Sequence, residues 1–342
     1  MKKRNGFFQL TNAVDVSQRL PIYTIRMKTL SLLVTAVLTV SLGGCPSNTI
    51  YQTPVTKFQT SAVSFTNIVR PYLQNINTLI VTANLYDEIG TGGNWKINDL
   101  KNGIPEKEIQ VRLKALSAIT NYANALAAVA DSKDIANLKA ATNTLGTNIN
   151  GLSTTIQSLN SDRTSQPPTS EAGKKAAQLD LSGPVSSIVT LVGTLVIENM
   201  QRQAIEDAIT KANKPVFEML DLLKQDLVDL AFVGDAAYSA KKTGLVFLYQ
   251  KIRVKADPKD LPALIDKLVQ ENNSIETMRA LQVDTLFNDM KAAHIALVTF
   301  AQSDKSPKSL SDLAAQIDVF TTHVQLFEQA IASIQSSTKS TK

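Results

Sequence analysis

The chain has 342 residues, of which 44% are hydrophobic and 6% aromatic, with 14 Gly, 12 Pro and a formal net charge of +5. Residues 1–44 hold six of the 35 basic residues and one of the 30 acidic residues, so the remaining residues are balanced at 29 of each and give no support for a nucleic-acid partner. The single cysteine, Cys45, excludes disulfide bonds within the chain and thiolate metal clusters.

An apolar segment precedes this cysteine. Residues 30–42 follow the basic Lys28 and form a run of 13 mostly apolar residues, whereas a helix that spans a membrane needs about 20. This pattern predicts a signal peptide that is removed, because it combines a short basic region, an apolar run of this length and small residues after the run. Residues 1–26 contain no apolar run, so we expect them to lie upstream of a true start at Met27.

The run ends Leu42-Gly43-Gly44-Cys45, which resembles the lipobox of bacterial lipoproteins. The resemblance covers only these residues, and no family is recognised for the rest of the chain. It implies cleavage between Gly44 and Cys45, a diacylglyceryl group on Cys45 and usually a further acyl chain such as palmitate. Several acyl chains hold a protein stably on a membrane, whereas one does so only marginally. The alternative is an ordinary thiol after an uncleaved apolar segment.

The resemblance also implies a location. In the sorting rule of Gram-negative lipoproteins, Asp after the cysteine favours the inner membrane, but this chain has Pro46. We therefore expect a protein of the cell envelope, lipid-anchored in the outer membrane and facing the periplasm if the source is Gram-negative. Residues 45–57 are polar and contain Pro54, which predicts a flexible tether between the lipid and the folded part.

Helical patterns dominate residues 58–160, the predicted N-terminal helical part. Apolar residues recur at steps of three and four over 62–86, 106–130 and 135–159, as on one face of a helix. Pro71 predicts that the first helix bends or begins close to it. The strict seven-residue repeat over 135–159 predicts coiled-coil-like antiparallel packing against the preceding helix.

Glycines surround the only tryptophan between the first two of these helices. An aromatic residue in a glycine-rich loop can form a contact point on a rigid scaffold, so Trp95, Gly92 and Gly93 form a candidate contact loop. The alternative is that Trp95 packs back over the helix ends. A phosphate-binding loop is not supported, because no Lys-Ser or Lys-Thr pair follows the glycines.

Residues 161–183 contain two prolines and several serines and predict a linker before a C-terminal helical part, 184–336. Its first segment, 185–197, is apolar nearly all round and predicts a central buried helix or, as the alternative, a segment that inserts into a membrane. Further helices are expected over 215–253, over 261–302, whole or broken near Asn272-Asn273, and over 310–334. Residues 337–342 should fray.

Charge is polarised along the segment 215–255. Its first half is acidic and its second half carries Lys241, Lys242, Lys251, Arg253 and Lys255. This order suits a solvated helix with a macrodipole, and the alternative is a surface that faces anionic lipid headgroups.

Motifs for catalysis or metal binding are not found. His294 and His323 lack the Glu-x-x-His and His-Glu-x-x-His patterns, and pairing of His323 with Asp318, or of His294 with Asp289, requires tertiary proximity. The acidic pairs Glu218/Asp221 and Asp226/Asp229 suit a solvated helix face. We therefore expect no catalytic residue, no metal and no cofactor.

These observations predict an all-α fold, an elongated bundle of about seven helices with coiled-coil-like antiparallel hairpins. The function predicted is that of a lipid-anchored, non-enzymatic spacer or protein-docking module, whose partners are the membrane through Cys45 and an envelope protein. One alternative is a toxin-immunity or membrane-active lipoprotein. Another is a ligand carrier or enzyme with a site between helices near Tyr238, Tyr249 and His294.

Overall fold

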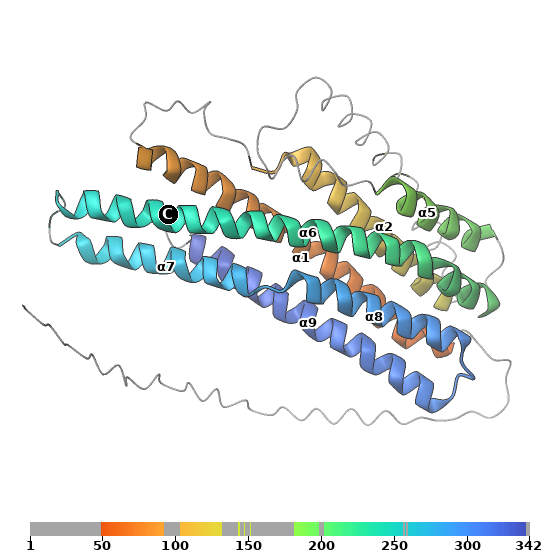
Figure 1. Cartoon of the computed structure of the whole chain (residues 1–342). Coiled ribbons are helices and arrows are strands. Elements are labelled where there is room, and N and C mark those ends of the chain that lie inside the picture. The colour runs from red at the N-terminus through yellow and green to blue at the C-terminus, as the bar shows by residue number, and fades with distance from the viewer. Residues whose placement is uncertain are drawn as a thin grey trace, which may run out of the picture. The chain divides into compact units, whose positions relative to one another are not determined.

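A computed structural model describes residues 49–91, 103–131, 181–197, 202–255, 257 and 259–339, together with Asn143, Thr147 and Gly151. These residues form helices and connecting turns, without a strand, which confirms the all-α prediction and its count of about seven helices. In chain order the helices are α1 (Thr49–Thr91), α2 (Glu106–Ala130), α5 (Ser182–Ile197), α6 (Arg202–Arg253), α7 (Leu261–Ala280), α8 (Val283–Gln302) and α9 (Pro307–Lys339) (Figure 1).

The two longest helices, α1 and α6, lie side by side and run in the same direction. Near their N-termini the Tyr51 hydroxyl donates a hydrogen bond of 3.0 Å to Glu206. Near their other ends the backbone of α6 at Gly244 lies close to Tyr86. The numbers of the contacting residues thus rise together on both helices, so the N-terminal ends of α1 and α6 lie at the same end of the bundle.

The C-terminal helices complete the bundle as antiparallel neighbours. The Lys291 ammonium on α8 donates to Asp221 on α6 at 2.7 Å, and Lys224 donates to Asn288 at 3.2 Å, so residue numbers rise on one helix as they fall on the other. Helix α9 folds back on α8 after a short turn at 303–306, which confirms the predicted hairpin.

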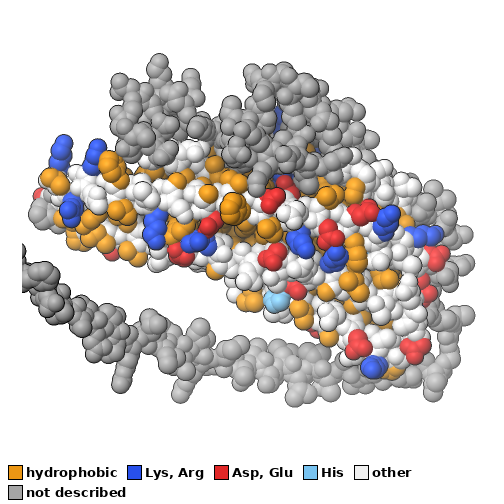
Figure 2. All heavy atoms as spheres, in the orientation of Figure 1, with side chains coloured by type: hydrophobic (Ala, Val, Ile, Leu, Met, Phe, Trp, Pro, Cys, Tyr) orange, Lys and Arg blue, Asp and Glu red, His pale blue; other side chains and the backbone are white. Residues whose placement is uncertain are grey.

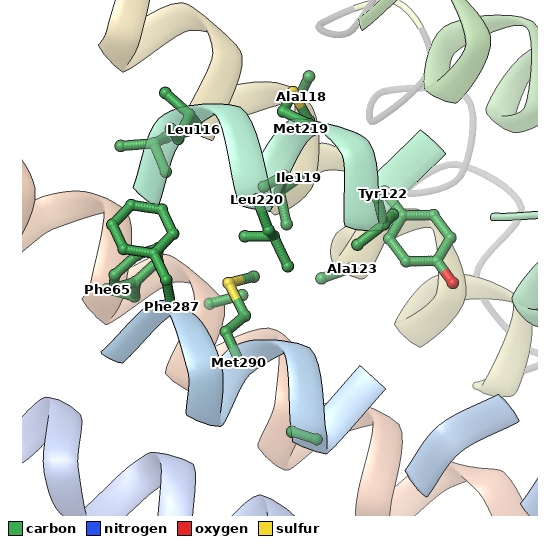
Figure 3. Packing of buried hydrophobic residues seen from close by; sticks show 14 of the residues in the cluster. Phe65, Leu116, Ala118, Ile119, Tyr122, Ala123, Met219, Leu220, Phe287 and Met290 are labelled. Atoms are coloured by element: carbon green, nitrogen blue, oxygen red, sulfur yellow. The ribbon is translucent and has the colours of Figure 1, made fainter. Parts of the chain in front are cut away.

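One hydrophobic core joins both predicted halves of the chain. Figure 3 shows Phe65 of α1, Ile119 of α2, Leu220 of α6 and Phe287 of α8 packed together. The rings of Phe65 and Phe287 meet edge to face, with centroids 5.0 Å apart. Because each fully buried side chain of this size contributes roughly 1.5–3 kcal/mol, this shared core holds the two parts in one domain.

The tether predicted over 45–57 is wrong for residues 49–57, which form the first turns of α1. Tyr51, Val55 and Phe58 are all fully buried. Their spacing of four and three residues continues the apolar stripe of the following helix, and that burial outweighs the polar composition of the segment.

Pro71, predicted to bend the first helix or to lie near its start, and Pro215, predicted to begin a helix, both lie inside helices. Pro71 falls within α1, and α6 begins at Arg202 and continues through Pro215. An interior proline costs about 3 kcal/mol. The buried residues that directly follow each proline, Tyr72 and Val216, offset this cost by packing into the core.

Helix α5 is not the central buried helix that its composition predicted. Val185 and Ile188 are buried, whereas Ser186, Ser187 and Thr190 are exposed. The small hydroxyl side chains therefore lie on a solvent-exposed side of the first part of α5, and among the described helices α5 packs against α2 and α6. In the described part of the chain, no helix combines the length and the apolar character needed to cross a membrane.

Other boundaries also differ from the predictions. The break in 261–302 lies at Leu281–Gln282 instead of Asn272-Asn273, since Asn272 sits inside α7 and accepts a hydrogen bond from Tyr238. Helix α5 begins at Ser182, inside the predicted linker, and α9 extends to Lys339, inside the predicted tail. The predicted helix over 135–159 lies outside the described residues, except for three helical positions.

Candidate functional site

The residues predicted for lipid attachment and for the contact loop lie outside the described part of the chain. These are Gly44, Cys45, Gly92, Gly93 and Trp95. The structure brings the remaining polar and titratable candidates into four places: a buried ion pair, a buried histidine, a surface histidine and the seam between α6 and α7.

The buried ion pair joins α2 to α6. Arg112 donates from Nε and Nη2 to the two carboxylate oxygens of Asp226, each at 2.6 Å, and from Nη1 to the backbone oxygen of Glu108 at 2.7 Å. Burial raises the pKa of Asp226, and the Arg112 guanidinium opposes that rise. The prediction of a solvated Asp226 is therefore wrong, and the pair is a structural connection inside the bundle.

His294 lies in the core, out of contact with solvent. Its Nε2 shares a hydrogen bond of 3.0 Å with the Tyr122 hydroxyl, and the rings of Phe58 and Phe217 lie against it. Burial lowers the pKa of His294 to about 3, so its ring is neutral at physiological pH. Among the described residues, its buried Nδ1 has no hydrogen-bond partner and no carboxylate orients the ring as in a catalytic pair.

The other histidine lies at the surface, which the sequence favoured over a catalytic role. His323 Nδ1 and Asp289 Oδ2 form a hydrogen bond of 2.5 Å between α9 and α8. Asp318, whose pairing with His323 the sequence left to tertiary proximity, instead accepts from Lys57 at 3.0 Å. Asp289 is thus paired with His323 and not with His294, because the antiparallel hairpin sets these two positions opposite each other.

The site imagined around Tyr238, Tyr249 and His294 does not form. His294 belongs to the main core, whereas Tyr238 packs with Leu79 and Ile275 in a second, smaller cluster. Among the residues that the structure describes, no group of three or more His, Cys, Asp or Glu side chains is arranged to hold a metal ion.

The seam between α6 and α7 contains two hollows. One, of about 320 Å³, is bounded by α1 as well and is lined by residues such as Tyr72 and Phe232. The other, of about 250 Å³, lies closer to the α6–α7 turn and is mainly apolar, and Ile275 lines both hollows. Between them the Tyr238 hydroxyl donates to Glu276 at 2.5 Å.

Apolar side chains remain exposed around the second hollow. We call residues 242–269, which include the end of α6, the turn and the start of α7, the hairpin tip. Val254 is 79% exposed, Val269 52%, Val246 51% and Ile265 43%. Figure 2 shows apolar and basic side chains gathered at the left end of the view, where Figure 1 places this turn. Such a cluster of exposed apolar residues marks an interaction surface.

Basic residues flank these apolar side chains. Residues 236–256 contain five basic residues and no acidic one, and the wider stretch 236–271 contains seven basic and four acidic residues. The sequence signal was visible in the run Leu-Val-Phe-Leu-Tyr at 245–249, followed by Lys251, Arg253 and Lys255. No family model, no curated protein and no solved structure matches this chain. The hairpin tip is the described surface best suited to bind a partner.

Proposed function

We propose that this protein is a lipid-anchored, non-enzymatic spacer of the cell envelope, which holds the hairpin tip away from the membrane that carries Cys45. Support for the anchor comes from the lipobox-like residues before Cys45. Helix α1 begins at Thr49, four residues later. A fully extended stretch of that length reaches about 14 Å, so the anchored end of the bundle is the end that contains the start of α1.

The observation that carries the proposal is the parallel course of α1 and α6. Tyr51, at the start of α1, bonds to Glu206, at the start of α6. From Glu206 the helix continues to Arg253, a distance of about 70 Å at 1.5 Å per residue. The hairpin tip is therefore about 70 Å along the bundle from the end that would be anchored.

The packing along this length suits a rigid spacer. Helix α6 is supported by α1, α2 and α8 around the common core and by α7 toward its end. Neither described histidine lies in a cleft, since His294 is buried in the core and His323 is paired on the surface. A mechanical role uses these features of the described bundle.

Fluorescence energy transfer tests the spacer geometry. If Cys45 is acylated, a single introduced cysteine is the only free thiol, so Lys255→Cys labels the tip and Lys308→Cys labels the opposite end. With the lipidated protein in phosphatidylcholine vesicles that contain an uncharged acceptor lipid, we expect strong transfer from position 308 and weak transfer from position 255. Equal transfer from both positions would contradict a spacer that stands away from the membrane.

Attachment itself is tested with Cys45→Ala. We expect the wild-type chain to incorporate labelled palmitate and to fractionate with membranes, and the variant to do neither while keeping the same helical circular dichroism spectrum. A wild-type chain that takes up no palmitate would overturn the proposed anchor.

A further inference from the structure

We infer that the hairpin tip binds an anionic lipid surface. The binding of the tip to lipid does not depend on the proposed function. That the tip serves as a second attachment, far from Cys45, rests on the proposed function. Three features of the tip carry this inference: its exposed apolar side chains, its excess of basic residues and the interleaving of the two kinds of residue on α6.

The apolar part of the tip faces solvent instead of the core. Leu245 is buried and fixes the end of α6, whereas Val246 and Val254 are exposed, and Phe247 and Tyr249 are half-buried. In water, Val246 and Val254 keep most of their apolar surface hydrated, and Phe247 and Tyr249 keep part of theirs. Burial in the boundary between headgroups and acyl chains would remove their apolar surface from water without any change in the fold.

The basic side chains alternate with these apolar ones. Lys251, Arg253 and Lys255 are exposed and lie within one turn of Val254. Lys251 Nζ lies 4.6 Å from the centre of the Phe247 ring. Lys241, in contrast, is held by Glu271 at 3.1 Å, so the charge free to meet a partner lies toward the turn.

A lipid surface suits this pattern better than a small molecule. The second hollow, of about 250 Å³, is smaller than the roughly 300–1,000 Å³ of ligand pockets. Aromatic rings at headgroup level with Lys and Arg reaching phosphates are typical of membrane interfaces. The net positive charge complements anionic headgroups.

Vesicle sedimentation of the chain from residue 46 onward tests the inference without the lipid anchor, because the described core lies wholly within that chain. We expect binding to mixed phosphatidylcholine and phosphatidylglycerol vesicles, weaker binding as salt is added, and no binding to phosphatidylcholine alone. Absence of binding to the mixed vesicles would overturn the inference, but it would leave attachment through Cys45 untouched.

Two sets of variants locate the contact. Lys251→Gln/Arg253→Gln/Lys255→Gln should weaken binding on the order of 100-fold. The matched control, Lys211→Gln/Lys214→Gln/Lys308→Gln, removes three exposed charges at the opposite end and should not change binding beyond a few-fold. Likewise Val246→Ser/Val254→Ser should weaken binding, whereas Val319→Ser/Leu326→Ser on α9 should not. Equal effects of the tip and control variants would refute the placement at the tip.

A photo-crosslinking residue at Val254 separates lipid from protein partners in native membranes. Adducts with phospholipid would support the inference. A discrete protein adduct, without lipid adducts, would overturn it and assign the tip to a protein partner. Thermal melting of each variant checks that the fold is retained, which is expected because every substituted side chain is exposed.

Discussion

Arg112 of α2 and Asp226 of α6 form a bidentate ion pair inside the bundle, with both donor–acceptor distances at 2.6 Å. The side chain of Arg112 is fully buried and that of Asp226 is 8% exposed. Glu108 accepts a further hydrogen bond from Arg112 through its backbone oxygen, and its carboxylate Oε2 lies 3.5 Å from Arg112 Nη1. The Asp226 carboxylate therefore depends on Arg112 for its stability, which makes the bundle sensitive to loss of the guanidinium.

Removal of Arg112 should cost more than removal of Asp226. Arg112→Met is expected to lower the free energy of unfolding by about 3–5 kcal/mol, because it leaves the buried carboxylates of Asp226 and Glu108 without their cation. Asp226→Leu should cost less, because Glu108 Oε2 still lies 3.5 Å from Arg112. The double variant should lose less than the sum of the two single losses. Urea denaturation measures all three, and a double variant whose loss equals the sum of the two single losses would contradict the coupling. Asp318→Asn, in an exposed pair with Lys57, serves as a control that should cost less than about 1 kcal/mol.

His294 should make the free energy of unfolding depend on pH. Its pKa is about 3 in the folded protein and near 6.5 when exposed. Between these values the unfolded chain binds a proton that the folded chain does not, so stability falls as pH falls, by about 1 kcal/mol for each pH unit. Tyr122→Phe/His294→Leu removes both hydrogen-bonding partners and this dependence.

The measurement is urea denaturation of both proteins between pH 7 and pH 4. As the pH falls, the free energy of unfolding of the wild type should fall more than that of the double variant. Parallel stability curves would show that His294 titrates normally in the folded protein. Circular dichroism at each pH checks that both proteins start from the same helical state.

Two glycines on α6 should respond to alanine with opposite signs. A Cβ at Gly244 would lie 2.5 Å from the Cβ of Tyr86, so Gly244→Ala should destabilise the protein by about 1–3 kcal/mol through separation of α1 and α6. A Cβ at Gly234 would lie 3.5 Å from Ile76, an ordinary contact. Gly234→Ala should therefore stabilise the helix, by about 1 kcal/mol at most. Thermal melting distinguishes the two, and equal shifts would argue against close approach at Gly244.

Substitutions at buried positions in the first turns of α1 should destabilise the protein as substitutions in the hydrophobic core do. Tyr51→Ala is expected to lower the free energy of unfolding by about 3–5 kcal/mol, because the side chain is fully buried against Phe300. Gln52, the next residue, is exposed, and Gln52→Ala should change stability by less than about 0.5 kcal/mol. Chemical denaturation of both variants tests this difference. If residues 49–57 were a flexible tether, both substitutions would be neutral.

The spacing of apolar residues predicted the helix positions correctly wherever a helix packs a single apolar stripe into the core. Helix α2 occupies the predicted 106–130, and the α8–α9 hairpin follows its heptad stripe. Local pattern failed where packing outweighed propensity, as at Pro215, whose helix begins earlier and continues because the next residue is buried. It also failed at α5, because composition alone does not say how many neighbours a helix has.

Polar groups were harder to place than apolar ones. Asp226 was expected in solvent because neighbouring acidic residues share its segment, yet its partner Arg112 lies 114 residues away in the chain. The pairing of His323 with Asp289 likewise depends on the register of α9 against α8. A carboxylate or imidazole has no local periodicity that reveals its partner, so only the packing of distant helices identifies it.

By itself the sequence determined the helical class, most helix positions and the resemblance around Cys45, because apolar spacing and short motifs are local properties. Only the tertiary structure decided that α1 and α6 run in the same direction, and hence that the hairpin tip lies far from the end that follows Cys45. The direction of each helix in the bundle and the helices beside it depend on which apolar stripes pack together. That choice is made by the free energy of one shared core and is not encoded in any single segment.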